Sequence, residues 1–456
     1  MNRRNLLAAF ALALLNHGGL PPRKAHGAAK GKTALVVGAG IAGLAAARGL
    51  KEHGFEVVVL EGRRRAGGRI HTDRSLGAPV ELGANWLENA DANPLLPLAK
   101  ELGLRLSPSD FESTALYDQG GVRFDQDELE ELLEDLDDLL DRLDERARRI
   151  AGDISIGQAV ADDLPRRHAS EEDRRELDWA LSTEVWEYAA ELNQLSLLHF
   201  DPDPASDPED LAVGGGYDRI VEHLSRGLDI RFEQEVSRIE YDEKRVRVFA
   251  GPDRFEADLA VVTLPLGVLK TNRVTFDPAL PERKRMAISR LAMGQLNKIV
   301  LAYPRRFWPD EVEFLGYVPR ERGGFRHFVS EFPATGKPIL TAIAAGDHAR
   351  ELERLKDSEI VAGAQRVLRK IYGRGVPEPE GVQVTRWGAD RFALGSYSYV
   401  PVGSSGDDYD ALAEPVSRRL LFAGEATHRR FPSTVHGAYL SGVREAERAA
   451  KMTARR

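Results

Sequence analysis

The chain has 456 residues, 42% of them hydrophobic and 30% charged, a composition typical of a soluble globular protein with two or three domains. Asp and Glu outnumber Lys and Arg by 72 to 63. The resulting net charge of −9 argues against a nucleic-acid binder and suits a small cationic partner better. Because the chain has no cysteine, disulfides, thiolate metal sites, a catalytic thiol and a thioether link to a cofactor are excluded.

Residues 1–28 are expected to be a signal peptide rather than part of the fold. Arg3 and Arg4 precede an apolar run that ends at Leu15, which is shorter than the ~20 residues of a membrane-spanning helix. The paired arginines followed by Leu-Leu suggest the twin-arginine type, and a disordered basic tail is the alternative. The sequence therefore predicts a bacterial protein exported by the twin-arginine machinery, periplasmic or secreted, with no stable membrane anchor.

The first element after this segment is predicted to be a dinucleotide-binding unit. Residues 33–37 form a short apolar, β-branched run typical of a buried parallel strand. The sequence GAGIAG follows at 38–43, an Ala-rich helix is expected over 44–50, and a second strand over 56–60 ends at Glu61. The glycine motif alone is weak evidence, but here it has its full strand–turn–helix–strand context.

Each residue of this unit has an expected role in holding a dinucleotide. Gly38 permits the tight turn, Gly40 and Ala42 bring the backbone near a pyrophosphate at the helix amino terminus, and Gly43 lets the helix pack on the strand. Glu61 is placed to bind a pair of ribose hydroxyls. An ordinary βα turn is the alternative.

A second motif, EGRRRAGGR at residues 61–69, follows the second strand directly. Its paired glycines allow close approach to phosphate, and Arg69 can bind two phosphate oxygens at once. Here the sequence resembles the FAD-dependent amine oxidases, which include monoamine oxidases, polyamine oxidases and flavin histone demethylases. The resemblance implies that Arg63 and Arg69 contact FAD; a solvated basic loop is the alternative, most plausibly for Arg64.

The segment ELGANWLE at residues 81–88 resembles the stretch beside the flavin ring in plant polyamine oxidases. The resemblance implies that the backbone of Gly83 and Ala84 lies against the ring. Glu88 matches a position where polyamine oxidases keep an acid for the amine chain, and a surface glutamate is the alternative.

The leucine spacing over about 124–150 predicts an amphipathic helix whose charged residues form a solvated face. Farther along the chain, a second acid that binds the amine is expected near residues 184–191. Glu184, Glu187 and Glu191 are alternatives that the sequence cannot separate firmly, and Glu187 is preferred.

Two further positions are assigned by the resemblance. Val236 matches a valine whose backbone bonds the adenine. Lys298 interrupts an apolar strand, where a charge is costly without a partner. It matches a lysine that bonds a water in contact with flavin N5; a lysine on the wet face of the strand is the alternative.

The carboxy-terminal third is expected to close the site. Trp387 lies in a segment that resembles the one over the flavin face, and Tyr397 and Tyr439 match two aromatic positions that frame the amine. Ser396 stands where monoamine oxidases carry the cysteine bonded to flavin, so FAD is expected to be non-covalent.

The last helix is expected to begin at the flavin. The resemblance implies that Gly424 and Glu425 bind the ribityl side and that Thr434 and Val435 present a helix amino terminus to the flavin pyrimidine. His428 and His436, the latter just after these residues, are interpreted as structural.

The fold class predicted from these elements is α/β. A discontinuous Rossmann-like FAD-binding domain of the glutathione-reductase type is expected over residues 30–88, 205–288 and 400–456. An α+β substrate-binding domain is expected over 89–204 and 289–399.

The resemblance implies an FAD-dependent amine oxidase, with polyamine oxidase preferred. Lys298, Tyr397 and Tyr439 would act at the reacting amine, and Glu88 and Glu187 would bind distal ammonium groups of a cationic amine or polyamine. Hydride transfer from an amine carbon to flavin N5, followed by reoxidation by O2, would give an aldehyde, a shorter amine and hydrogen peroxide. Monoamine or L-amino-acid oxidation and a non-catalytic flavin-binding protein are the alternatives; a histone-demethylase-like role is disfavoured by the expected export signal.

Overall fold

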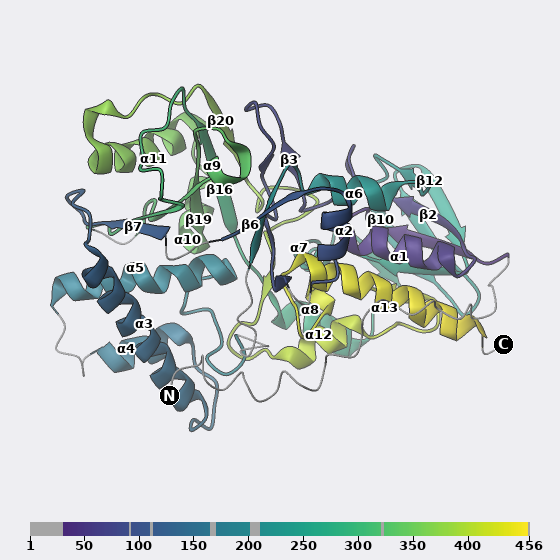
Figure 1. Ribbon diagram of the computed structural model, residues 1–456. Helices are drawn as coiled ribbons and strands as arrows, with labels where there is room; N and C mark the ends of the chain where they lie inside the picture. Colours follow the sequence, from purple (N-terminus) through teal and green to yellow (C-terminus); the bar gives the residue numbers. More distant parts are fainter. Residues whose placement is uncertain are drawn as a thin grey trace.

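The computed structural model describes residues 31–90, 93–109, 113–164, 170–200, 210–320 and 323–454. Figure 1 shows two lobes joined by strands that pass between them. One lobe carries α1 (Ile41–Glu52) and α13 (Val435–Ala454) side by side, and the other carries α3 (Gln126–Ala147), α5 (Glu171–Tyr188) and α11 (Asp357–Tyr372).

A five-stranded parallel sheet forms the centre of the first lobe, in the order β22-β13-β1-β2-β9. Its strands are β1 (Thr33–Val37), β2 (Glu56–Leu60), β9 (Asp229–Arg231), β13 (Leu259–Val262) and β22 (Leu420–Phe422). The apolar runs predicted as strands at 33–37 and 56–60 are these central strands, and β13 is buried along its whole length, as expected for a sheet covered on both faces.

α1 and α13 pack closely on one face of this sheet because small residues line their contact. A Cβ at Gly442 would lie 2.1 Å from the backbone oxygen of Ala42, so a glycine is needed there for the helices to approach. This packing brings the amino termini of both helices to the same end of the sheet, where the glycine turn also lies.

The rest of this lobe is a mixed four-stranded sheet and several short helices. The strands are β10 (Val236–Tyr241), β11 (Val246–Ala250), β12 (Asp253–Ala257) and β14 (Thr275–Asp277). The helices are α6 (Asp218–Ser225), α7 (Leu266–Leu269), α8 (Glu282–Arg290) and α12 (Gly406–Ala413).

The second lobe is built on a six-stranded sheet in the order β20-β16-β19-β18-β17-β7. Its strands are β7 (Thr114–Tyr117), β16 (Leu296–Ala302), β17 (Phe314–Tyr317), β18 (His327–Ser330), β19 (Ile339–Ala345) and β20 (Gly381–Val384). The helices not yet named are α2 (Leu96–Glu101), α4 (Ile156–Asp163), α9 (Phe332–Thr335) and α10 (Gly346–Leu352).

α3 is the amphipathic helix predicted over 124–150. It begins with a capping box between Asp125 and Glu128. Its buried side chains are leucines at helical spacing: Leu129, Leu132, Leu136, Leu139 and Leu143.

Three small sheets hold the segments between the lobes. They are β5 (Trp86–Leu87), β8 (Leu211–Gly214) and β6 (Arg105–Pro108); β3 (Thr72–Asp73) with β4 (Val80–Glu81); and β15 (Ala292–Met293) with β21 (Ser398–Tyr399). The α/β fold class is confirmed, whereas the predicted domain boundaries stay a prediction. No helix in the described part of the chain is both long and apolar enough to cross a membrane.

Candidate active site

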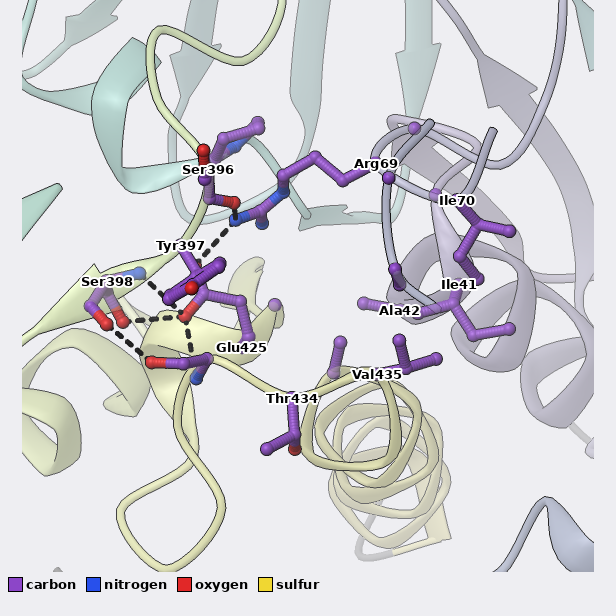
Figure 2. Close-up of a pocket in the computed structure, with 18 of the residues that line it drawn as sticks. Ile41, Ala42, Arg69, Ile70, Ser396, Tyr397, Ser398, Glu425, Thr434 and Val435 are labelled. Carbon is purple, nitrogen blue, oxygen red and sulfur yellow. Dashed lines mark hydrogen bonds and ion pairs between the residues drawn. The ribbon is translucent and has the colours of Figure 1, made fainter. Parts of the chain in front are cut away.

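A cavity of about 740 Å³ runs along the carboxyl ends of β1 and β2 and on toward the second lobe. Most of the site residues predicted from the sequence line it, although they come from segments far apart in the chain. They are Gly38, Gly40, Ala42, Glu61, Arg63, Arg69, Gly83, Ala84, Glu88, Glu187, Val236, Lys298, Trp387, Tyr397, Gly424, Glu425, Thr434 and Val435. Figure 2 shows how part of this wall is assembled, with Ile41 and Ala42 near Val435.

One end of the cavity is the amino terminus of α1. Gly40 is its N-cap residue and makes no side-chain cap hydrogen bond, so the first amides of the helix are left as donors. A Cβ added to Gly40 would meet no protein atom within 4 Å. The space that a Cβ of residue 40 would occupy is therefore part of the cavity, as expected where a backbone approaches a pyrophosphate.

Gly43 does not line the cavity, and its predicted packing role explains why. A Cβ there would lie 1.9 Å from the backbone oxygen of Gly38, so only glycine allows α1 to lie this close to the turn. The turn itself has a positive φ of 105° at Gly38.

Glu61 lies at the end of β2 and is 6% exposed. Its carboxylate accepts one hydrogen bond from the backbone N–H of Ala39 and one from that of Arg63, both at 2.8 Å. These bonds fix the carboxylate at the cavity wall, where each oxygen has a lone pair left for a further donor. Its contact with ribose hydroxyls stays a prediction.

Arg63 lines the cavity but is held by Asp390, a partner that the sequence analysis missed. Its two terminal nitrogens donate to the two oxygens of Asp390 at 2.8 and 2.7 Å, and its guanidinium lies 5.2 Å from the ring centroid of Phe392. Burial acts to raise the pKa of Asp390, but the hydrogen bonds and charge of Arg63 hold it below its usual value.

Arg65 stabilises the same loop from inside by donating to three of its carbonyl groups. Burial and the charge of neighbouring Arg63 together lower the pKa of Arg65 to about 10, against the opposing charges of Glu61 and Asp390.

Arg69 and Glu425 form an ion pair in the middle of the cavity wall (Figure 2). Arg69 Nη1 donates to Glu425 Oε1 at 2.9 Å and to the backbone oxygen of Ser396 at 2.8 Å. The other oxygen of Glu425 accepts from Ser398 Oγ and from the backbone N–H of Ser433. Arg69 thus ties the loop after β2 to the carboxy-terminal segments, and its contact with phosphate stays a prediction.

Lys298 lies in the middle of β16, is 4% exposed and faces the cavity. Its Nζ donates to the backbone oxygens of Glu81 and Gly83, both at 2.9 Å, and to Asn85 Oδ1 at 3.3 Å. Burial lowers the pKa of Lys298, while the negative charges of Glu331 and Glu81 oppose this shift. The lysine therefore holds the segment that carries Gly83 and Ala84, and its predicted contact with a water is untested.

Three aromatic side chains line the far end of the cavity. The ring centroids of Trp86 and Trp186 are 6.1 Å apart, and Tyr397 donates its hydroxyl to the backbone oxygen of Trp186 at 2.8 Å. Burial raises the pKa of Tyr397 well above its usual value, and the charges of Glu187 and Glu88 raise it further. The tyrosine, two tryptophans and two acids thus share one region of the wall.

Tyr439 is the predicted aromatic partner of Tyr397 that the structure does not bring to the cavity. It packs against the core of the first lobe and is not among the described residues of the cavity wall. It lies one helical turn, about 6 Å along α13, beyond Val435. The expected pair of tyrosines is therefore replaced by Tyr397 with Trp186 and Trp86.

The structure also separates the three alternatives for the second acid. Glu187, near the end of α5, lines the cavity, whereas Glu184 is not among the described residues of its wall. Glu191 accepts a hydrogen bond from the backbone N–H of Asp347 at the start of α10. The sequence could not show this, because α5 ends at Ala189 in a left-handed conformation that turns the chain away.

The two histidines that were interpreted as structural, His428 and His436, differ in position and in hydrogen bonding. His428 Nδ1 accepts from the backbone N–H of Phe431, and burial lowers the pKa of His428 to about 4, as suits a structural residue. His436 instead lines the cavity, is 2% exposed, and has its Nδ1 3.7 Å from Glu88 Oε2.

These features fit a flavin dinucleotide. The uncapped helix start and the open space at Gly40 suit a pyrophosphate, and Glu61 suits a ribose. Ser396, which stands where monoamine oxidases carry the flavin-bonded cysteine, exchanges hydrogen bonds between its hydroxyl and the backbone of Leu296. The chain has no thiol to form such a link.

Comparison with known proteins also indicates a flavin-binding protein. The family model described as flavin containing amine oxidoreductase matches residues 41–450. The chain is 41% identical over 431 residues to lysine-specific histone demethylase 1 homolog 2 of Oryza sativa subsp. japonica, covering 91% of this chain and 56% of that protein. It is 39% identical over 436 residues to polyamine oxidase 3 of the same organism, covering 91% and 88%. The chain thus spans little more than half the length of the demethylase homologues.

Among solved structures, putrescine oxidase bound to putrescine matches with a TM-score of 0.74, covering 91% of this chain and 98% of that chain. At 22% identity this likeness shows the fold alone.

These relatives correct one expectation. The predicted localisation, an exported periplasmic or secreted protein of bacterial origin, is wrong, because the curated relatives include proteins of Oryza sativa and Arabidopsis thaliana named as histone demethylase homologues. The sequence analysis disfavoured a histone-demethylase-like role, and proteins named as demethylase homologues match across 91% of the chain. The predicted signal peptide and its twin-arginine recognition fall on residues outside the described part of the chain.

The family model covers most of the chain, and both curated relatives match over almost all of it. FAD is the cofactor that goes with this membership. The chain belongs to the family of flavin-containing amine oxidoreductases.

Proposed function

We propose that the protein is an FAD-dependent amine oxidase whose substrate is a polyamine. The observation that carries the proposal is the meeting of two carboxylates, Glu88 and Glu187, with Trp86, Trp186 and Tyr397 in one region of the cavity wall. The relative named polyamine oxidase 3 supports it. When bound, FAD supplies the two-electron acceptor for oxidation of an amine carbon, with O2 as the final acceptor and hydrogen peroxide as its product.

Different residues of the cavity wall are expected to bind different parts of a polyamine. A polyamine is a chain of methylenes with several ammonium groups, so it needs negative charge at some points and apolar surface between them. Glu88 and Glu187 neutralise distal ammonium groups, and the aromatic rings cover the methylenes and exclude water. A monoamine would leave at least one of the two carboxylates without a partner, which is costly in a partly buried site.

Lys298 acts by position and charge. Its three hydrogen bonds fix the segment between β4 and β5 that carries Gly83 and Ala84, and its buried Nζ places a positive group beside the reacting end of the cavity. Such a fixed charge costs no reorganisation when charge develops during the reaction. Arg69 and Glu425 hold the opposite wall in place by their ion pair.

An assay of peroxide release with a panel of amines tests the proposal. We expect spermine or spermidine to give peroxide at lower concentration than putrescine, and tyramine to be poorest. Oxidation of tyramine alone would refute the polyamine assignment. Oxidation of an amino acid alone would favour the amino-acid oxidase alternative. A yellow protein that no amine reduces would favour a non-catalytic flavin-binding protein.

A peptide with a methylated lysine is the second candidate substrate, because relatives named as histone demethylase homologues match this chain at up to 41% identity. The same acids could bind the cationic side chains of a basic peptide. Release of formaldehyde from such a peptide, compared with peroxide from spermidine at equal concentration, separates the two substrates.

A further inference from the structure

His436 combines burial with an absence of hydrogen bonds. It is 2% exposed, and neither ring nitrogen has a hydrogen-bond partner among the residues that the structure describes. Glu88 Oε2, 3.7 Å from His436 Nδ1, is buried and lacks a partner in the same way. Leaving a donor and an acceptor of this kind unpaired costs free energy, so both groups are set to bind something that enters the cavity.

The His436 ring is held by packing rather than by polar contacts. Its centroid lies 4.6 Å from that of Phe431, and Phe431 stacks on His428 with an interplanar angle of 15°. The backbone N–H of Phe431 donates to His428 Nδ1, which anchors the stack. The imidazole is therefore fixed in orientation, and its two nitrogens are buried at the cavity wall without a partner among the described residues.

We propose that His436 and Glu88 together form the receptor for a distal ammonium group of the substrate. When the ring proton of His436 is on Nε2, the lone pair of Nδ1 lies beside Glu88 Oε2, 3.7 Å away. Nδ1 and the carboxylate then both act as acceptors. Two acceptors side by side suit an ammonium group, which has three donors, and disfavour a substrate carboxylate.

This inference rests on the proposed function and specifies it further. The substrate class that it names is an amine with a second protonated nitrogen away from the oxidised carbon. His436 is a binding residue for that second nitrogen, not a group that touches the reacting carbon.

The test compares two substrates in the holoenzyme: spermidine, and hexylamine, which lacks a second nitrogen. Replacing His436 by Leu should raise the KM for spermidine by about tenfold or more, the loss expected for a hydrogen bond to a charged group. The kcat for spermidine and the KM for hexylamine should change less than about threefold. His436→Gln, which keeps a donor and an acceptor, should restore most of the affinity.

A double-mutant cycle with Glu88→Gln tests whether the two residues act as one unit. We expect His436→Leu to add little to the effect of Glu88→Gln, because the receptor is already lost. His53→Gln is the matched control, because His53 Nε2 is also buried without a partner among the described residues but lies outside the cavity wall; it should leave the ratio of the two KM values unchanged.

Several results would overturn the inference. Equal effects of His436→Leu on both substrates, additivity with Glu88→Gln, or loss of bound FAD without a change in spermidine affinity would each do so. If His436→Leu does not fold, His436→Asn, whose shorter side chain cannot reach both partners, replaces it. If the wild-type enzyme oxidises no amine, the proposed function fails separately. Calorimetric titration of spermidine into the holoprotein then decides, and equal affinity in wild type and variant contradicts the receptor.

Discussion

Replacing Asp390 by Asn should loosen the hold of the protein on FAD. The side chains of Arg63 and Asp390 are 14% and 24% exposed, and their two hydrogen bonds join the loop after β2 to the segment that follows Trp387. Both Arg63 and Phe392 line the cavity near Glu61. Opening this contact therefore uncovers one end of the site.

The magnitude follows from the burial of the pair. Breaking a fully buried ion pair costs about 3–5 kcal/mol, and an exposed one less than about 1 kcal/mol. The pair of Arg63 and Asp390 is mostly buried, and Asp390→Asn removes only the charge of one partner. The expected free-energy cost therefore lies between these two limits, at about 2 kcal/mol. If this energy keeps the contact closed, the open population and the rate of FAD release should rise about 30-fold.

The assay follows the fluorescence of flavin released after dilution, together with the denaturant midpoint of the holoprotein. Arg64→Gln is the control, because Arg64 pairs with Glu233 nearby but the two side chains are 87% and 61% exposed. FAD release at the wild-type rate from Asp390→Asn, or equal acceleration by Arg64→Gln, would refute the reasoning.

Four other changes have definite expected outcomes. Lys298→Met should retain flavin but slow its reduction by amine about tenfold or more, or ~1.4 kcal/mol of barrier, measured by stopped-flow absorbance. Gly40→Ala should leave the melting temperature of the apoprotein unchanged, since its Cβ meets no protein atom, yet weaken FAD binding at least about tenfold. Tyr439→Phe should change kcat/KM less than about twofold, whereas Tyr397→Phe should lower it more, because only Tyr397 lines the cavity. The pKa of His428 is lowered to about 4, so the contribution of this neutral, buried histidine to stability is complete above about pH 6.5. That contribution is lost as the pH falls from about 6.5 to about 4. His428→Gln should therefore flatten the pH dependence of the unfolding free energy between these two pH values.

Matched variants make these outcomes decisive. Lys337→Met removes an exposed lysine, and Gly152→Ala adds a Cβ that also meets no protein atom within 4 Å but lies outside the cavity wall. Neither should affect flavin reduction or FAD affinity. Wild-type reduction in Lys298→Met, a lower apoprotein melting temperature in Gly40→Ala, a large loss in Tyr439→Phe, or an unchanged pH profile in His428→Gln would contradict the corresponding argument.

The parts of the site that could be predicted from the sequence are those whose signal is local. The spacing of Gly38, Gly40 and Gly43 between two apolar strands predicts the turn and the helix start, and Glu61 follows directly from the second strand. Lys298 is recognisable because a charge in an apolar strand needs a partner. Short-range patterns of this kind do not depend on how distant segments meet.

The parts that sequence reasoning missed depend on long-range contacts. Arg63 and Asp390 are 327 positions apart, and no pattern near either residue indicates the other. Trp186 was not singled out, although an aromatic residue next to Glu187 was an available signal, and His436 was interpreted as structural although it lines the cavity. Tyr439 was misplaced because similarity of a helical segment does not show which of its residues reaches a cavity one turn away.

The close contact of α1 with α13 has a consequence for how the holoprotein is made. The glycine turn at residues 38–43 is synthesised long before Thr434 and Val435, which form another part of the same cavity wall. A growing polypeptide therefore presents only part of the binding site for the prosthetic group until residues 434 and 435 have been added. A polypeptide that stops before these residues would lack this part of the wall, so we expect it to bind the vitamin-derived cofactor weakly.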